Sequence, residues 1–285
     1  MSLEIKTTNL GAEIISVKFN GEEKIHQGSN VLDKNGNVFW KRHAPVLFPI
    51  VGSLKDNKTI INGKEYYMSQ HGFARDMNFE LIEKNDNIHS YVLKSSNETL
   101  EKYPFDFELY ITYVVNNDKL ITKYKVINKD SKKMPFGIGG HPAFICNISN
   151  NDSYIEFDVH QEKIEFLQLE NGLIKEYPVK LDILKNKKRI DLNNELFFND
   201  AIIMKNVSGD NVYLKNKDNE ILKFNFKGFP YLALWSKENA PFVCIEPWYT
   251  IADKINTDGM FENKEGTIIL DPDKSFECEY EVQFK

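Results

Sequence analysis

The strongest constraint on the fold is a series of Asn-rich turns, each lying between two runs of alternating apolar and polar residues. Asn20-Gly21 separates two such runs in "IISVKFNGEEKIHQ", and Asn62-Gly63 does the same in "KTIINGKEYYMS". Asn-Gly favours a type I′ turn because both central residues of that turn need a positive φ. Similar paired runs flank residues 116–118 and 217–219. These segments predict a succession of antiparallel β-hairpins.

Signals for helices are scarce. "SNETLEKYPF" predicts one short helical turn, capped by Asn97 and stopped at Pro104. The chain has no long 3.6-residue periodicity, no alternation of strands with helices and no glycine-rich phosphate loop. Many short strands, with turns roughly every 8–12 residues, are typical of a large antiparallel β-sandwich. We therefore expect an all-β fold in which residues 1–285 form a single domain.

The charge pattern narrows the choice of partners. The chain has 42 acidic and 36 basic residues, interspersed, with a net charge of −6. The densest basic run, "KNKKR" at 185–189, is typical of a solvated turn, so nucleic acid is not an expected partner. No signal peptide is evident, and no apolar run approaches the ~18 residues needed to span a bilayer. We expect a cytoplasmic protein without a membrane partner, and a homodimer is left open.

The three cysteines do not form a recognisable pattern. Cys146, Cys244 and Cys278 are scattered and have no CxxC spacing. Neither a disulfide framework nor a structural zinc site is therefore expected.

"FGIGGHPAF" contains the first candidate for proton transfer, His141. Two glycines precede this histidine and allow close backbone approach, and Pro142 stiffens the chain after it. A histidine with a reference pKa of about 6.5 can hold or release a proton near neutral pH. The segment alone is equally consistent with a general acid and with a buried structural histidine.

"CIEPWY" contains a carboxylate at the end of an apolar run. Glu246 is followed by Pro247 and Trp248, and we expect it near a strand end. An unpaired buried carboxylate is costly, so a partner or a ligand hydroxyl group is implied. Pro247 and Trp248 can form a flat wall against the C–H surface of a sugar ring. A salt-bridged glutamate at a strand end would show the same pattern.

Two further polar segments lie in the first quarter of the chain. "QHGFARD" places His71, Arg75 and Asp76 together, and Gly72 favours a loop over a helix. "WKRHAP" adds Arg42 and His43, for which a basic pair on the surface is the more common outcome. The remaining histidines lie in alternating strand patterns and are expected on the surface: His26, His89 and His160.

Two histidines and a carboxylate on separate strand ends suit an acid–base site. The same set would also suit a metal site with two histidines and one carboxylate. The tight H-x-H or HExxH spacing of many metal sites is missing, which favours acid–base chemistry.

Taken together, these segments resemble the aldose 1-epimerase (galactose mutarotase) family, and in particular its LacX-like branch. The resemblance extends from "NLGAEIISV" through "APVLFPIVGSLKDN", "QHGFARD", "FGIGGHPAF" and "NDAII" to "IEPWYTIAD". It implies a large antiparallel β-sandwich, or supersandwich, with an open cleft for a sugar. It also implies interconversion of the α and β anomers of a free aldose, without a metal or an organic cofactor, because both half-reactions are proton transfers.

The resemblance also implies roles for individual residues. Glu246 matches the general base, His141 the general acid at the ring oxygen, and His71 a second histidine that polarises the same oxygen. Hydroxyl groups of the sugar would be held by Asp200, Arg75 and Arg42, with Trp248 beside them.

One position departs from the family pattern. Ser53 stands where relatives often have an arginine after the glycine of "PIVG". This makes a hexose-6-phosphate mutarotase harder to argue without excluding it, because Arg42 and Arg75 could still meet a phosphate group. The same residues also leave room for a catalytically silent carbohydrate-binding protein and for a metalloenzyme.

Overall fold

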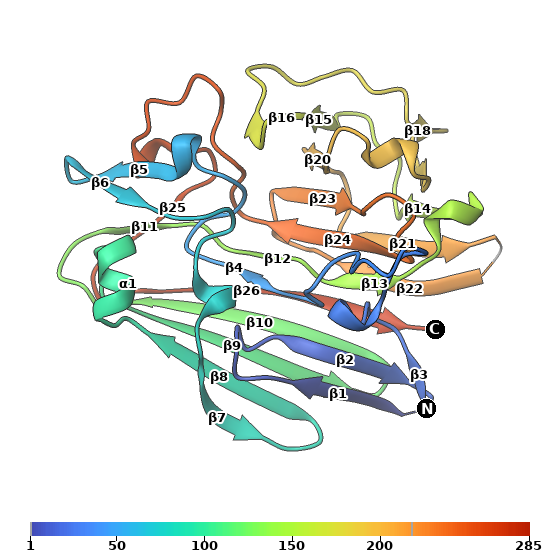
Figure 1. The fold of residues 1–285 in the computed structure, drawn as a ribbon, viewed down its shortest axis with the longest axis horizontal. Helices are drawn as coiled ribbons and strands as arrows, with labels where there is room; N and C mark the ends of the chain where they lie inside the picture. Colours follow the sequence, from blue (N-terminus) through green and yellow to red (C-terminus); the bar gives the residue numbers. More distant parts are fainter. Residues whose placement is uncertain (1, 218) are drawn as a thin grey trace.

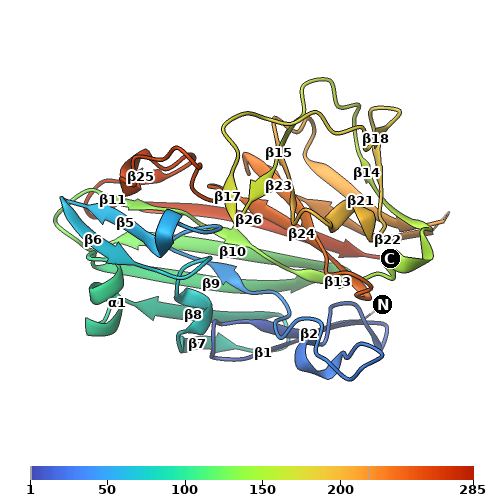
Figure 2. The ribbon, with the colours of Figure 1, turned by 45° about the horizontal axis from the view of Figure 1, so that its top comes forward.

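The structure is a computed structural model that describes residues 2–217 and 219–285. Two large sheets dominate it, and the pairs of named strands in the described residues are antiparallel. Figures 1 and 2 show the long strands of one sheet running beneath the strands of the other. The expected all-β fold with a large antiparallel sandwich is confirmed.

The larger sheet has ten strands in the order β18-β19-β14-β21-β22-β26-β10-β9-β8-β7. Their bounds are β7 Glu80–Lys84, β8 Ile88–Lys94, β9 Phe107–Asn116, β10 Lys119–Asn128, β14 Ser153–Phe157, β18 Leu184–Lys185, β19 Arg189–Asp191, β21 Asn211–Asn216, β22 Asn219–Asn225 and β26 Ser275–Phe284. The C-terminal strand β26 lies between β10 and β22, so the last segment of the chain joins the two halves of this sheet.

The second sheet has seven strands and provides the framework of the candidate site. Six of them follow the order β15-β20-β23-β24-β12-β4, and β13 pairs with β24 beside this path. Their bounds are β4 Val46–Leu47, β12 Gly139–Gly140, β13 Ala143–Ile145, β15 Glu165–Leu167, β20 Ile202–Lys205, β23 Tyr231–Trp235 and β24 Phe242–Trp248.

Short elements complete the fold. The small sheets are formed by β1 Leu3–Thr7, β2 Ile14–Phe19 and β3 Glu22–Glu23; β5 Lys58–Ile61 and β6 Lys64–Tyr67; β11 Met134–Phe136 and β25 Ile268–Leu270; and β16 Leu169–Glu170 and β17 Leu173–Ile174. The helical turns are α1 Asn97–Lys102, η1 Gly28–Asn30, η2 Lys55–Asn57, η3 Ala74–Asp76, η4 Ile148–Asn150, η5 Glu195–Phe197 and η6 Phe261–Asn263.

The local predictions hold at the hairpins and need one correction at the helix. Asn20-Gly21 and Asn62-Gly63 have positive φ angles and connect β2 to β3 and β5 to β6. Residues 116–118 connect β9 to β10; residue 218 of the other expected turn lies outside the described residues. The N-cap of α1 is Ser96, not Asn97, because the Ser96 side chain accepts a hydrogen bond from the Thr99 amide in a capping box.

The alternation along β24 explains how a buried strand can serve two purposes. All seven of its residues are buried. Val243 and Ile245 belong to the main core, together with residues of β9, β10 and β26. Because side chains alternate across a strand, Cys244, Glu246 and Trp248 face the opposite side. The inner face of this sheet therefore closes the core, and its outer face is free to form a site.

The described residues also bear on the absence of a membrane span. Within 2–217 and 219–285, none of the helical segments has the length and apolar character needed to cross a bilayer.

Candidate active site

A cavity of about 240 Å³ lies over the outer face of the seven-stranded sheet. Its floor comes from β20, β23 and β24, and its walls come from loops distant in the sequence. The residues that line it are Trp40, Gly52, Gln70, His71, Arg75, His141, Leu169, Gly172, Asp200, Ala201, Ile203, Trp235, Glu246, Trp248 and Ala252. The cavity thus gathers six of the seven predicted site residues.

Glu246 lies within β24, two residues before its end, where it pairs with Ala233 of β23. This differs slightly from the predicted strand end. The carboxylate is 1% exposed, and its Oε2 atom has no hydrogen-bond partner in the described residues. A buried carboxylate without a donor is unfavourable, so burial, together with the charge of Asp200, raises the pKa of Glu246 well above its ordinary value.

His141 follows β12 at a break in the sheet, where the chain leaves β12 and re-enters it as β13. Its backbone N–H donates to the Pro45 carbonyl. Gly140 lets this segment lie flat on the larger sheet, because a Cβ atom there would be 2.9 Å from the Tyr280 ring. Burial, followed by the charge of Arg75, lowers the pKa of His141 to about 3.

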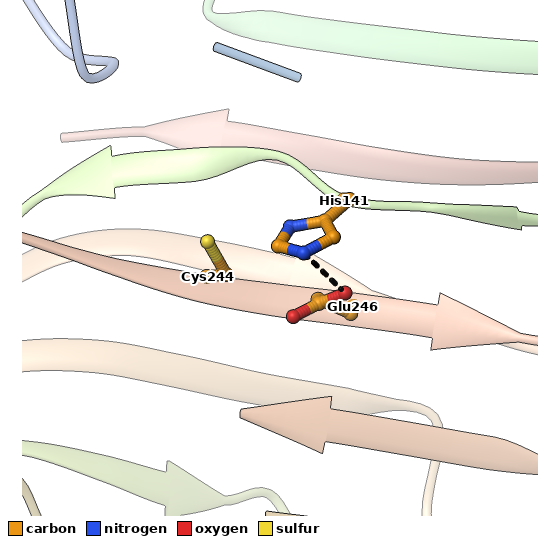
Figure 3. Close-up of side chains that lie close together, drawn as sticks. All are labelled: His141, Cys244 and Glu246. Carbon is orange, nitrogen blue, oxygen red and sulfur yellow. Dashed lines mark ion pairs between the residues drawn. The ribbon is translucent and has the colours of Figure 1, made fainter. Parts of the chain in front are cut away.

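The two groups face each other across the cavity floor. The Nε2 atom of His141 is 3.3 Å from the Oε2 atom of Glu246 (Figure 3). Burial opposes charge on both side chains, so the pair favours the state in which it holds a single proton and is neutral overall. That proton can lie on either residue, which makes the pair an acid and a base separated by one hydrogen-bond length.

His71 is held by the backbone in an unusual conformation. Its φ is 68°, in the left-handed region, and its N–H donates to the Gly52 carbonyl at 2.8 Å. The Gly52 amide in turn donates to Nδ1 of His71 at 3.1 Å. Because an amide N–H can only donate, Nδ1 must be unprotonated, and neutral His71 carries its hydrogen on Nε2.

The electrostatic surroundings keep His71 in that neutral form. Burial is the largest cause of its strongly lowered pKa, followed by His141 and Arg75. Protonation would also place a second N–H against the Gly52 amide. His71 is therefore a neutral hydrogen-bond donor to whatever occupies the cavity.

Three tryptophans enclose the histidines. Trp40 stacks on His141 with ring centroids 4.8 Å apart, and Trp235 meets the same ring edge-on at 5.6 Å. Trp248 lies 6.4 Å from His71. Only Trp248 was predicted as a site residue; Trp40 and Trp235 were missed. Their signal was present, since Trp40 opens the "WKRHAP" segment and Trp235 ends an alternating strand.

The predicted binding residues divide between the cavity and its surroundings. Asp200 is exposed at the cavity, with a φ of 75°, and accepts a hydrogen bond from the Ala201 amide. Arg75 also lines the cavity and donates to the Gln70 carbonyl at 2.7 Å. Arg42 is not brought to the cavity: its guanidinium donates to Asp76 at 2.7 Å, behind Arg75.

Three predictions about basic residues were wrong. Arg42 and His43 are half-buried instead of forming a surface pair. His26 is buried against Phe242 and its Nε2 hydrogen-bonds the Trp40 carbonyl at 2.9 Å. His89 is buried and its Nδ1 lies 2.8 Å from the Thr7 hydroxyl oxygen. Of the three strand histidines only His160 is exposed.

One cysteine lies beside the acid–base pair. Potential ligand atoms of His141, Cys244 and Glu246 lie within 4.8 Å of one another (Figure 3). Sequence spacing gives part of this signal, because Cys244 and Glu246 are two residues apart on one strand face. Burial holds the pKa of the Cys244 thiol well above its usual range, which disfavours the thiolate that binds metals.

Solved structures define the class to which this fold belongs. A galactose mutarotase-related enzyme from Lactobacillus acidophilus is 32% identical, with a TM-score of 0.90 over 99% of this chain and 94% of its own. A galactose mutarotase-like protein from Lactobacillus casei is 27% identical, with a TM-score of 0.91 over 99% of this chain and 97% of its own. The fold is thus the galactose mutarotase-like β-sandwich.

Sequence comparison gives the family. The profile of the family described as aldose 1-epimerase matches residues 2–282. A curated relative, the plasmid-borne protein LacX of Lactococcus lactis subsp. lactis, is 31% identical over 275 residues, or 92% of this chain and 90% of the relative. The chain belongs to the aldose 1-epimerase family, and the expected resemblance to LacX is confirmed. Membership supports a mutarotase-type activity on sugars.

Proposed function

We propose that this protein interconverts the α and β anomers of a free aldohexose by opening and reclosing the sugar ring. The observation that carries the proposal is the buried pair of His141 and Glu246, 3.3 Å apart on the floor of a cavity. Ring opening needs a base at the anomeric hydroxyl group and an acid at the ring oxygen, and this pair supplies both.

The proposed reaction begins when the shared proton lies on His141 and Glu246 is ionised. Glu246 takes the proton of the anomeric hydroxyl group while His141 gives its proton to the ring oxygen. The bond between C1 and the ring oxygen breaks, and an aldehyde forms at C1. After rotation about C1–C2, the former ring hydroxyl attacks C1, its proton returns to His141, and Glu246 protonates the carbonyl oxygen. The pair begins and ends with one proton.

The other cavity residues would bind and orient the sugar. His71 would donate from Nε2 to the ring oxygen, because its Nδ1 is occupied by the Gly52 amide. Asp200 would accept hydrogen bonds from hydroxyl groups at the open side of the cavity, where it is exposed. Arg75 would contact further hydroxyl groups, and Trp248 would pack against the C–H surface of the ring.

Polarimetry on freshly dissolved pure anomers tests this proposal. We expect the wild-type protein to accelerate the mutarotation of α-D-glucose, α-D-galactose or both above the buffer rate. Hexose 6-phosphates belong in the same panel because Arg75 lines the cavity. Rates equal to buffer on every free and phosphorylated sugar, together with measurable sugar binding, would support a non-catalytic carbohydrate-binding protein instead.

A further inference from the structure

Four segments of the chain meet at Asp253, the last residue of "IEPWYTIAD", which has no role in the proposed reaction. Asp253 is 4% exposed, and its Oδ1 atom is 3.1 Å from the ammonium group of Lys264, which is also buried. Its Oδ2 atom accepts a hydrogen bond from the Lys55 amide at 3.0 Å. Its own N–H donates to the Ser53 carbonyl at 2.9 Å. Asp253 therefore fixes the path of residues 53–55.

That path begins at Gly52, the residue that holds His71. Gly52 exchanges two hydrogen bonds with His71, one through its carbonyl and one from its amide to Nδ1. It also lies directly on Ala252, since a Cβ atom at Gly52 would be 2.6 Å from the Cβ of Ala252. The position of the Gly52 amide thus depends on the contacts that residues 252 and 253 make.

The same aspartate supports a second wall of the cavity. The Asp253 carbonyl accepts a hydrogen bond from the Ile174 amide at 2.8 Å. Ile174 ends the β16–β17 hairpin, whose residues Leu169 and Gly172 line the cavity. Figure 2 shows β17 above β24, on the side where this wall rises.

A purely stabilising role does not explain why the two buried groups are charged. Removing two charges from water is costly, and an apolar pair of similar volume is often as stable. A charged carboxylate can, however, accept from an ammonium group and from a backbone amide at once, with defined geometry. Asp253 uses one oxygen for each.

We propose that Asp253, held by Lys264, is a positioning residue of the active site. It fixes the 52–55 segment so that the Gly52 amide meets Nδ1 of His71 and keeps the His71 proton on Nε2. This inference rests on the proposed function for its kinetic consequence, but its structural consequence is measurable without any activity.

The variant Asp253→Asn tests the proposal, because an amide side chain has one acceptor oxygen where the carboxylate has two. Asp158→Asn is the matched control: Asp158 also accepts from backbone amides in a loop, at Asp210 and Asn211, but does not line the cavity. We expect kcat to fall by about tenfold to a hundredfold in Asp253→Asn, with a smaller change in KM, and to stay close to wild type in Asp158→Asn.

Nitrogen-15 NMR of the histidine rings gives the second readout. In wild type, the Nδ1 atom of His71 should resonate as an unprotonated nitrogen and Nε2 as a protonated one. In Asp253→Asn both signals should shift toward a mixture of tautomers. An unchanged His71 spectrum in folded Asp253→Asn would overturn the proposal. If wild type shows the fixed tautomer and Asp253→Asn loses it, the positioning role holds even where no mutarotation is measured.

A second variant keeps the test decisive if Asp253→Asn does not fold. Lys55→Pro removes only the amide that donates to Asp253, at the first position of the η2 turn, after a residue with an extended backbone that accepts a following proline. Lys55→Ala is its control, because both variants lose the side-chain bond to the Ile255 carbonyl. We expect Lys55→Pro, and not Lys55→Ala, to mix the His71 tautomers; equal spectra would overturn the proposal.

Discussion

The Nε2 atom of His141 lies 3.3 Å from the Oε2 atom of Glu246, and neither side chain is more than a tenth exposed. Both groups are pushed toward their neutral forms, since burial lowers the pKa of His141 to about 3 and raises that of Glu246. The pair therefore holds one proton over a wide pH range. Its two titration steps belong to the pair as a unit.

The pH dependence of mutarotation should follow this one-proton state. Below the lowered pKa of His141 the pair gains a second proton and loses its base. Above the raised pKa of Glu246 it loses its last proton and with it the acid. We expect a bell-shaped profile of kcat/KM whose acidic limb lies below pH 6.5, the ordinary histidine value, and whose alkaline limb lies above the ordinary carboxylate value. A flat profile would contradict the acid–base assignment.

His71→Asn should lower the rate without unfolding the protein. Asparagine tolerates the left-handed backbone of this position, but its amide does not reach the place of Nε2. Removing one positioned donor typically costs about 10²-fold in kcat. His160→Asn, the same change at an exposed position, is the control. A His71→Asn variant as active as His160→Asn would show that the donor is not used.

Gly72→Ala should destabilise the loop that carries His71. A Cβ atom at Gly72 would lie 2.3 Å from the Phe48 carbonyl oxygen, which belongs to the backbone and has little freedom to move. Gly63→Ala is the matched control, because Gly63 has nearly the same φ, 76° against 73°, and nothing within 4 Å of its Cβ position. We expect the free energy of unfolding in urea to fall about 1–3 kcal/mol further for Gly72→Ala. Equal losses would mean that the loop adapts.

Metal should not be required. The Cys244 thiol is fully buried and has a raised pKa, so it is a poor third ligand beside His141 and Glu246. We expect substoichiometric metal by elemental analysis, unchanged mutarotation after treatment with EDTA, and nearly normal activity of Cys244→Ser. One equivalent of bound metal, with activity lost on chelation and restored by the metal, would favour a metalloenzyme.

Local signals in the sequence predict the hairpins well, because an Asn-Gly turn and its flanking alternation lie within a dozen residues. The order of the strands is different in kind. The pairing of β26 with both β10 and β22 joins segments up to about 160 residues apart, and no local pattern specifies such partners. That the whole chain forms one domain stays a prediction.

The candidate site shows the same division. Glu246 and His141 stand out because titratable groups lie beside glycine, proline and tryptophan in apolar runs. Trp235 was missed because a tryptophan in an alternating strand usually packs in the core, and only the pairing of β23 with β24 turns it toward His141. His26 and His89 were misplaced because alternation does not say which face of a strand is buried, and each has a hydrogen-bond partner inside the fold.

The central claim is tested most directly by polarimetry of α-D-glucose and α-D-galactose with wild type, Glu246→Gln and His141→Asn. Glu101→Gln, at an exposed position, serves as the control. We expect wild type and Glu101→Gln to accelerate mutarotation equally, His141→Asn to lose on the order of 10²–10⁴, and Glu246→Gln to retain almost no catalysis. A folded Glu246→Gln protein that accelerates mutarotation as wild type does would contradict the assignment of Glu246 and His141 as the base and the acid.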